Sequence, residues 1–225
     1  MFSCFADLAK VLGNGHRLEL IELLAQGEQP VEVLSQRTGL SFANASQHLQ
    51  QLRKAGLVVG RRSGKNIIYR LEDGPIVEAM TALRKLAEHN VAAVQDVVAT
   101  YFDQLDNLDP IGPDDLMDRM RNGSVTLLDV RPEDEFRAGH IPGALNIDLE
   151  KLDSRIAELP MDVDIVAYCR GTYCVLSFEA VKLLRGRGYR ATRFSEGLPE
   201  WRASGRAVAT AGSDSAATRV SSGGP

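Results

Sequence analysis

The stretch Leu34–Leu57 carries two helical patterns separated by a glycine, and it restricts the fold more than any other feature of the chain. The first pattern predicts a helix over 31–38 that stops at Gly39, because glycine readily adopts the conformation that ends a helix. Ser41 is a good N-cap residue and begins a second pattern that runs to about Ala55. Helix, glycine turn and second helix in this order predict a helix-turn-helix.

The second helix combines an apolar stripe with polar residues on its other sides. Ala45, Leu49 and Leu52 share one face, so we expect them to pack inward. Asn and Gln side chains can pair with the edge of adenine in the major groove of DNA. The residues of this segment that we expect to contact DNA are Ser41, Asn44, Ser46, Gln47, His48, Gln50 and Gln51.

Two short strand patterns follow, at 57–59 and 66–69, and the turn between them is basic. We expect Arg61, Arg62 and Lys65 of this turn to lie against DNA phosphates. The first third of the chain carries more Lys and Arg than Asp and Glu, although the whole chain has a formal net charge of −4. These features favour DNA binding over the alternative, an ordinary helical hairpin with a polar outer face.

The segments Leu12–Ile21 and Leu49–Val58 resemble hallmark segments of the ArsR/SmtB family of winged helix-turn-helix repressors. The resemblance covers about residues 5–99, and it includes a last helix that we expect to run from Pro75 to about Tyr101. It implies a homodimer built from the first and last helices of the domain. It also implies a palindromic DNA operator, because a two-fold dimer places its two recognition helices about one DNA turn apart.

Members of this family often sense metal ions, and this chain departs from their ligand patterns. The helix over 31–38 contains no cysteine. The last helix offers Glu88, His89 and Asp96, and Cys4 lies near the N-terminus. We interpret these as solvated polar residues and a terminal thiol, and we predict no metal and no other cofactor.

In the second half of the chain, strand patterns alternate with helical patterns. Such alternation predicts an α/β domain with a mostly parallel sheet. The strands are expected at 125–129, 165–168 and 191–194, and the helices at 113–120, 151–158, 175–187 and 198–203.

One cysteine of this domain lies where a strand passes into a helix. Cys169 directly follows the strand at 165–168, and the next helix begins near Val175. Backbone N–H groups and a helix N-terminus surround a sulfur atom at such a junction, and they would lower the pKa of the thiol and stabilise a thiolate or persulfide. Arg170 adds positive charge that could guide thiosulfate. The alternative is a buried cysteine that ends a core strand.

Three segments in order, 127–131, 135–144 and 168–174, together with 196–201, resemble a single-domain rhodanese over about residues 111–208. The resemblance implies sulfur transfer through a persulfide on Cys169. Related phosphatase and arsenate-reductase domains use one more loop residue and close the loop with Arg, whereas this chain has Val175 in that place. The shorter loop suits a sulfur atom better than a tetrahedral phosphate.

The sixth loop position is Cys174, where rhodaneses usually carry another residue, often Arg. A second thiol beside a persulfide-forming thiol is the arrangement expected of a redox sensor. The alternative is a small buried side chain in the first helical turn, and both interpretations stay open. The residues that we expect to support the loop are Asp129 and Arg131 as a pair, His140 as a cap of a neighbouring turn, Gly171, Thr172, and Glu196 as an acceptor of loop N–H groups.

The predicted architecture is a mainly α winged helix-turn-helix domain with a β-hairpin wing, followed by an α/β rhodanese-like domain. The expected boundaries are 1–102 for the first domain, 103–112 for a linker, 113–208 for the second domain and 209–225 for a disordered tail. An odd, small number of cysteines and the lack of a long apolar run favour the cytoplasm, with no membrane partner.

The sequence therefore predicts a repressor whose operator affinity responds to sulfur loading or oxidation at Cys169. Its expected partners are a palindromic operator, a second copy of the chain and a small sulfur donor such as thiosulfate or polysulfide. Two alternatives stay open: a sulfurtransferase with an attached DNA-binding module, and a metal-responsive repressor whose rhodanese domain only docks partners.

Overall fold

The computed structural model describes residues 1–97, 110–172 and 174–210. The chain divides into two compact units between residues 82 and 83, and each is described by itself. We call them the N-terminal unit and the C-terminal unit. The predicted linker over 103–112 and the predicted tail over 209–225 lie mostly outside the described residues. Among the described residues, none of the helices has the length and apolarity needed to cross a membrane.

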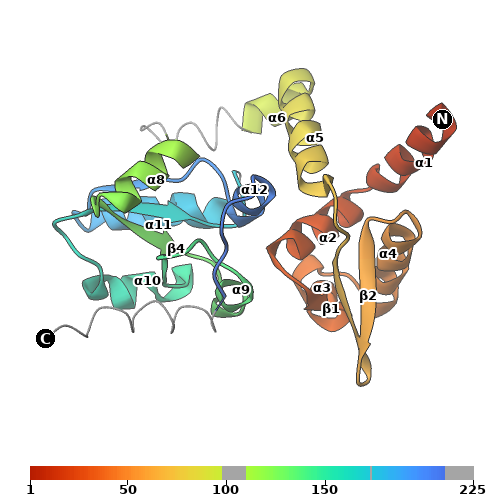
Figure 1. Ribbon diagram of the computed structural model, residues 1–225, viewed down its shortest axis with the longest axis horizontal. Helices are drawn as coiled ribbons and strands as arrows, with labels where there is room; N and C mark the ends of the chain where they lie inside the picture. Colours follow the sequence, from red (N-terminus) through yellow and green to blue (C-terminus); the bar gives the residue numbers. More distant parts are fainter. Residues whose placement is uncertain (98–109, 173, 211–225) are drawn as a thin grey trace, which may run out of the picture. The chain divides into compact units, whose positions relative to one another are not determined.

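The N-terminal unit packs helices against a small antiparallel sheet of order β1-β3-β2. Its elements are α1 (Phe2–Leu12), α2 (Gly15–Gln26), β1 (Gln29–Pro30), α3 (Val31–Thr38), α4 (Phe42–Lys54), β2 (Val58–Ser63) and β3 (Asn66–Leu71) (Figure 1). The strands β2 and β3 form the predicted wing. This order of elements confirms the winged helix-turn-helix.

Local sequence signals explain the bounds of α3 and α4. Gly39 follows α3 in the left-handed conformation, with φ of 66°. The Ser41 hydroxyl caps α4 by accepting a hydrogen bond from the Asn44 amide. Leu49 and Leu52 of α4 are fully buried in one core with residues of α2 and α3. The turn is therefore held by caps at its ends and by apolar packing beneath it.

The long helix predicted from Pro75 to about Tyr101 is instead two helices. These are α5 (Ile76–Asn90) and α6 (Ala92–Val97), and residues 98–101 lie outside the described part of the chain. Side-chain amides bind carbonyls at the end of α5: Asn90 donates to the Leu86 oxygen, and Gln95 donates to the His89 oxygen. Such local bonds compete with the helical ladder and end the helix.

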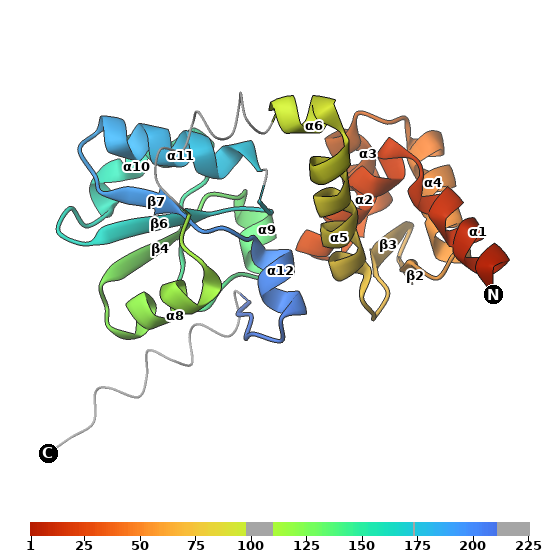
Figure 2. The same ribbon diagram turned by 90° about the horizontal axis from the view of Figure 1, so that it is seen from above.

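The C-terminal unit is a parallel four-stranded sheet with helices on both faces. Its elements are α8 (Pro113–Arg121), β4 (Val125–Asp129), α9 (Glu133–Ala138), β5 (Leu145–Asn146), α10 (Leu149–Arg155), the 3₁₀ turn η2 (Ile156–Glu158), β6 (Asp164–Tyr168), α11 (Val175–Gly186), β7 (Ala191–Arg193) and α12 (Leu198–Ala203). The strand order is β5-β4-β6-β7. Helices α10 and α11 cover one face, and α8 and α12 cover the other (Figure 2).

The sheet confirms the predicted α/β domain, and backbone pairing extends the unit at both of its ends. Ile111, from the predicted linker, donates its amide to the Arg193 oxygen and is buried. Ala209, from the predicted tail, exchanges two backbone hydrogen bonds with His140. Strand β5 and helix α9 were not predicted, because a strand of two residues and a helix of six are too short to show a period.

Candidate functional site

The recognition helix α4 presents a polar outer surface in the expected place. Asn44, Gln47 and Gln50 are exposed, and Ser46 is half-buried. Ser41 is also exposed, but its hydroxyl already serves as the cap of the helix. The polar set that remains open to a ligand is therefore Asn44, Gln47 and Gln50, with Ser46 at its edge.

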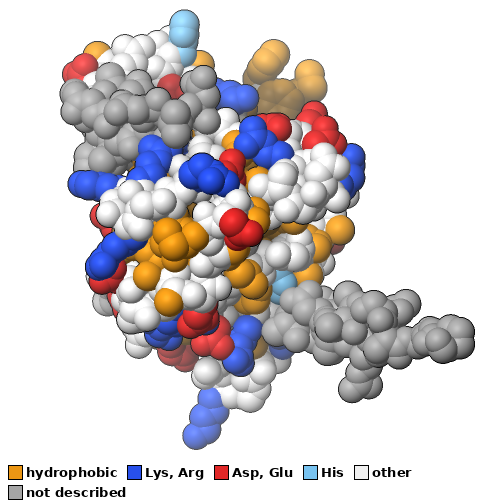
Figure 3. All heavy atoms as spheres, turned by 90° about the vertical axis from the view of Figure 1, so that its left-hand side faces the viewer, with side chains coloured by type: hydrophobic (Ala, Val, Ile, Leu, Met, Phe, Trp, Pro, Cys, Tyr) orange, Lys and Arg blue, Asp and Glu red, His pale blue; other side chains and the backbone are white. Residues whose placement is uncertain are grey.

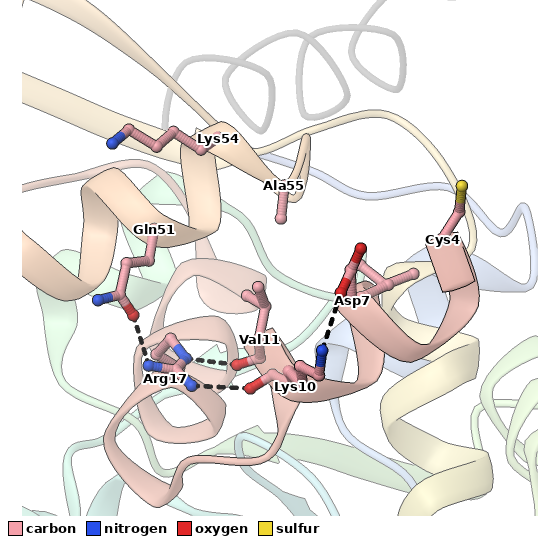
Figure 4. A pocket seen from close by; sticks show the side chains of 9 residues that line it. Cys4, Asp7, Lys10, Val11, Arg17, Gln51, Lys54 and Ala55 are labelled. Atoms are coloured by element: carbon pink, nitrogen blue, oxygen red, sulfur yellow. Dashed lines mark hydrogen bonds and ion pairs between the residues drawn. The ribbon is translucent and has the colours of Figure 1, made fainter. Parts of the chain in front are cut away.

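Gln51 has a different role from the one expected. Its Oε1 accepts a hydrogen bond of 2.6 Å from Nη1 of Arg17. The same guanidinium donates to the carbonyl oxygens of Lys10, at 3.0 Å, and of Val11. Figure 4 shows Arg17 between α1 and α4, at the edge of a pocket of about 620 Å³ that Cys4 also lines. Arg17 therefore connects the last turn of α1 to Gln51 of the recognition helix.

His48 is turned toward another histidine. The centres of its ring and the His16 ring lie 5.7 Å apart. Its Nδ1 is buried and has no hydrogen-bond partner among the described residues. Burial, with the charge of Arg17 and the nearby His16, lowers the pKa of His48. The lowered pKa favours the neutral ring, and the DNA contact of His48 stays a prediction.

The wing carries the predicted basic residues, but one of them is already bound. Arg61 donates to both carboxylate oxygens of Glu28, at 2.5 and 3.3 Å. This hydrogen bond lowers the pKa of Glu28. Arg62 and Lys65 are exposed near the tip, where Arg62 donates to the Gly64 oxygen. Arg62 and Lys65 are the cations of the wing that face solvent without a carboxylate contact among the described residues.

In the C-terminal unit, Cys169 follows β6 as predicted, but it is buried in the core. The residue is 1% exposed and belongs to the core between the sheet and the helices α10 and α11. Its sulfur lies 3.5 Å from the Cys174 oxygen and 3.5 Å from Oγ of Ser177. Burial raises the pKa of Cys169, so the lowered pKa expected from the loop is not found there.

The second thiol has the properties that were expected of the first. Cys174 is half-buried and is the N-cap residue of α11. A hydrogen bond from the Cys169 thiol, with bonds from the backbone amides of Arg170 and Leu176, lowers the pKa of Cys174 to about 7. The Cys169 thiol also donates to the Cys174 carbonyl oxygen at 3.5 Å, and the pKa shifts of the two cysteines have opposite directions.

Arg170 binds Glu135, a residue for which no role was predicted. Its guanidinium binds Glu135 in a two-bond arrangement, Nη2 to Oε1 at 2.6 Å and Nε to Oε2 at 2.9 Å. Glu135, in the first turn of α9, is fully buried. The one signal in the sequence for this partner was that Glu135 begins the segment 135–144. A buried Glu is rare unless it is paired, and here Arg170 is its partner.

Asp129 and Arg131 form the predicted pair, and both side chains are fully buried. Their closest oxygen and nitrogen are 2.6 Å apart, and the Asp129 carboxylate also accepts the Arg131 backbone amide at 3.0 Å. Arg131 donates further to the Gly139 oxygen. Hydrogen bonds and the charge of Asp129 outweigh burial and raise the pKa of Arg131. The pair holds the end of β4 to the end of α9.

The other predicted support residues differ in their roles. His140 Nδ1 lies 2.9 Å from the Phe136 oxygen at the end of α9, which fits the expected cap. Thr172 donates to the Ser195 oxygen. Glu196 departs from its expected role: its Oε2 is buried and no described residue donates to it, and burial raises its pKa. The carboxylate that accepts an amide here is Glu200, which binds the Gly197 N–H.

The described residues contain no cluster of metal ligands, and on one face of the C-terminal unit the charges are mixed. Figure 3 shows one face of the C-terminal unit, where basic and acidic side chains alternate. The described residues of this unit form ion pairs such as Arg119–Asp115 and Arg190–Asp164. Across residues 1–97, 110–172 and 174–210, no three His, Cys, Asp or Glu side chains cluster as metal ligands would, and Glu88, His89 and Asp96 are included in that statement.

Comparisons with known proteins agree with both units. Residues 14–59 match the bacterial regulatory protein, arsR family, and residues 112–204 match the rhodanese-like domain. The HTH-type transcriptional regulator Rv0324 of Mycobacterium tuberculosis is 41% identical over 203 residues, which are 90% of this chain and 89% of that protein. A sulfurtransferase of Allochromatium vinosum is 35% identical over 78 residues, 34% of this chain and 71% of its own length. The homodimeric winged helix-turn-helix DNA-binding domain Mb0332 of Mycobacterium bovis is 34% identical, covers 41% of this chain and 85% of its own, and gives a TM-score of 0.38.

Proposed function

Because this chain belongs to the arsR-family transcriptional regulators that carry a C-terminal rhodanese-like domain, we propose that sulfur chemistry at Cys169 and Cys174 controls its affinity for operator DNA. The chain is a DNA-binding transcriptional regulator. The observation that carries the control mechanism is the proximity of the two cysteines of one loop: the Cys169 thiol lies 3.5 Å from the Cys174 carbonyl oxygen, and hydrogen bonds lower the pKa of Cys174 to about 7. A thiol with that pKa is half thiolate near neutral pH and reacts readily with sulfane sulfur.

The DNA contacts in this proposal come from α4 and the wing. Asn44, Gln47 and Gln50 reach base edges in the major groove, because they are the exposed amides of the recognition helix. Arg62 and Lys65 contact phosphates and position the protein without reading sequence.

The regulator acts as a homodimer on a palindromic operator in the cytoplasm. Support for the dimer comes from α1, which has no buried residue and exposes Phe2 and Phe5. Apolar surface of this kind marks an interface. The related domain of Mycobacterium bovis is described as homodimeric.

Replacing Arg62 and Lys65 together by Ala is expected to weaken binding about tenfold on every DNA sequence. It should also lower the slope of log affinity against log salt by about 2, because each phosphate contact releases close to one counterion. Fluorescence anisotropy over a salt series measures both quantities. The matched control replaces Arg121 and Arg137, two exposed arginines of the C-terminal unit. An unchanged salt slope in the wing variant would remove the wing from the DNA interface.

The control mechanism is tested by operator affinity in two redox states. A duplex selected from random DNA by the reduced protein serves as the operator. Treating wild type with polysulfide should change its affinity by about 5–150-fold, the usual size of coupling between two sites. Cys169→Ser and Cys174→Ser should each lose this response, because the pair then lacks a thiol. If all three proteins shift equally, or none shifts, the pair is not the sensor and sulfur transfer itself becomes the main activity of the C-terminal unit.

A further inference from the structure

One apolar side chain of the recognition helix has no role in the contacts described so far. Phe42, the first residue of α4, is 54% exposed. We propose that the Phe42 ring contacts the methyl group of a thymine in each half of the operator, and so sets part of the DNA sequence preference. This rests on the proposed function in one respect, namely that α4 lies in the major groove of DNA. It adds a second kind of base reading to that of the exposed amides.

The exposure of the ring follows from the way α4 begins. The Ser41 hydroxyl accepts a hydrogen bond from the Asn44 amide and fixes the first turn of the helix. Leu49 and Leu52, further along the helix, are fully buried in the core of the N-terminal unit. Phe42 precedes Leu49 by about two turns, and it is neither in that core nor among the described residues that pack against it. The ring therefore lies at the solvent-exposed start of the helix.

The neighbours of Phe42 on the helix belong to the surface to which DNA contacts are assigned. Ser46 and Gln50 stand four and eight positions further on, so they follow Phe42 along one side of the helix. Gln50 is exposed and Ser46 is half-buried. In helix-turn-helix proteins the N-terminal residues of the recognition helix contact base edges. Phe42 therefore lies where the helix first meets the bases.

The chemistry of the ring selects one group in the groove. Phe has no hydrogen-bond donor or acceptor, so it cannot pair with the polar edges of the bases. The C5 methyl of thymine is the apolar group that the major groove presents, and Phe is one of the side chains that contact it. The contact removes apolar surface of both partners from water.

A second copy of the chain is the alternative cover for this ring. The apolar surface of the proposed dimer lies on α1, where Phe2 and Phe5 are exposed. Phe42 lies instead beside exposed polar residues of α4, Asn44 and Gln47. Its continuity with these residues favours DNA as the partner of the ring.

The test removes the methyl group and nothing else. A duplex selected from random DNA by the reduced wild-type protein serves as the operator. Its thymines are replaced by deoxyuridine, one position at a time and in both halves, because deoxyuridine keeps the hydrogen-bonding groups of thymine. At one position the wild-type affinity, measured by fluorescence anisotropy, should fall about 15-fold. This is about fourfold for each half, the size expected for one buried methyl group.

Replacing Phe42 by Ala completes the comparison. Phe42→Ala should bind the thymine operator about 15-fold more weakly than wild type, and deoxyuridine at the sensitive position should change its affinity by less than about twofold, because both changes remove the same contact. Its affinity for unrelated DNA should stay within about twofold of wild type, since phosphate contacts do not involve the ring, and this shows that the variant is folded. Met161→Ala is the matched control: it removes another exposed apolar side chain, in the C-terminal unit, and should keep the wild-type dependence on the methyl group.

The outcomes separate this inference from the proposed function. An equal loss on deoxyuridine in wild type and in Phe42→Ala would assign the methyl contact to another residue and overturn the inference. A wild-type affinity that changes at no deoxyuridine position would overturn it as well. Gln47→Ala should weaken binding to the selected operator whether or not Phe42 contacts a methyl group. If neither Gln47→Ala nor Phe42→Ala changes this affinity, α4 does not read the bases, and the DNA contacts of the proposed function fail together with the inference.

Discussion

Replacing Asp129 by Ala is expected to lower the free energy of unfolding of the C-terminal unit by about 3–5 kcal/mol. The Arg131 guanidinium is fully buried, and removing its carboxylate would leave a positive charge in the protein interior without compensation. The Arg131 amide would lose its acceptor as well. This loss changes the ratio of folded to unfolded protein by a factor of about 160 to 5,000.

The single tryptophan provides the measurement. Trp201 is 5% exposed and lies in the C-terminal unit, so its fluorescence during urea unfolding reports on that unit. Asp118→Ala serves as the control, because it removes an acid from an exposed pair with Arg121 and should cost less than about 1 kcal/mol. A loss in Asp129→Ala no larger than in Asp118→Ala would show that the buried pair does not stabilise this unit.

Replacing Gly197 by Ala is expected to slow sulfur uptake about 100-fold. An added Cβ would lie 2.4 Å from both the Arg170 carbonyl carbon and the Gly171 amide nitrogen, which are backbone atoms of the cysteine loop. Neither atom can rotate away, so the loop itself must move. A displacement of about 1 Å at a reacting group typically costs a factor of 100 in rate. The same clash should destabilise the unit by about 1–3 kcal/mol.

The two effects can be separated. Sulfur uptake from polysulfide is measured by intact mass at a temperature where urea unfolding shows the variant to be folded. Gly186→Ala is the matched control, because no atom lies within 4 Å of its added Cβ, and it should leave uptake unchanged. Uptake by a folded Gly197→Ala protein at the wild-type rate would mean that loop placement does not limit the reaction.

The bounds of the recognition elements could be predicted because they depend on neighbouring residues. Gly39 and Ser41 act within a few positions of themselves, so their effects can be read in the sequence. The strand, loop and helix around Cys169 were predictable for the same reason. The buried pair of Asp129 and Arg131 was also predictable, since its members are two residues apart.

The contacts that change the site are made between distant positions. Gln51 meets Arg17 across 34 positions, Arg61 meets Glu28 across 33, and Arg170 meets Glu135 across 35. Neither the composition nor the spacing of residues indicates which of these distant residues will be in contact. The pKa order of the two thiols depends on which sulfur the core encloses. Burial of Cys169 by α10 and α11 is a property of tertiary packing, and a strand–loop–helix pattern does not contain it.

Helix α1 makes this regulator sensitive to its own abundance. An eleven-residue helix is only marginally stable by itself in water, and α1 buries none of its residues within its own chain. Val11 and Leu12 at its end pack against the core of the unit. In the proposed dimer association would order the rest of the helix, and by mass action the ordered fraction would rise with the number of chains. Since Arg17 ties the last turn of α1 to α4, completion of the DNA-reading surface follows the same dependence. The number of regulator molecules in the cell would then have two effects. It would set how many operators are occupied, and it would set the amount of signal needed for the regulated promoter to respond.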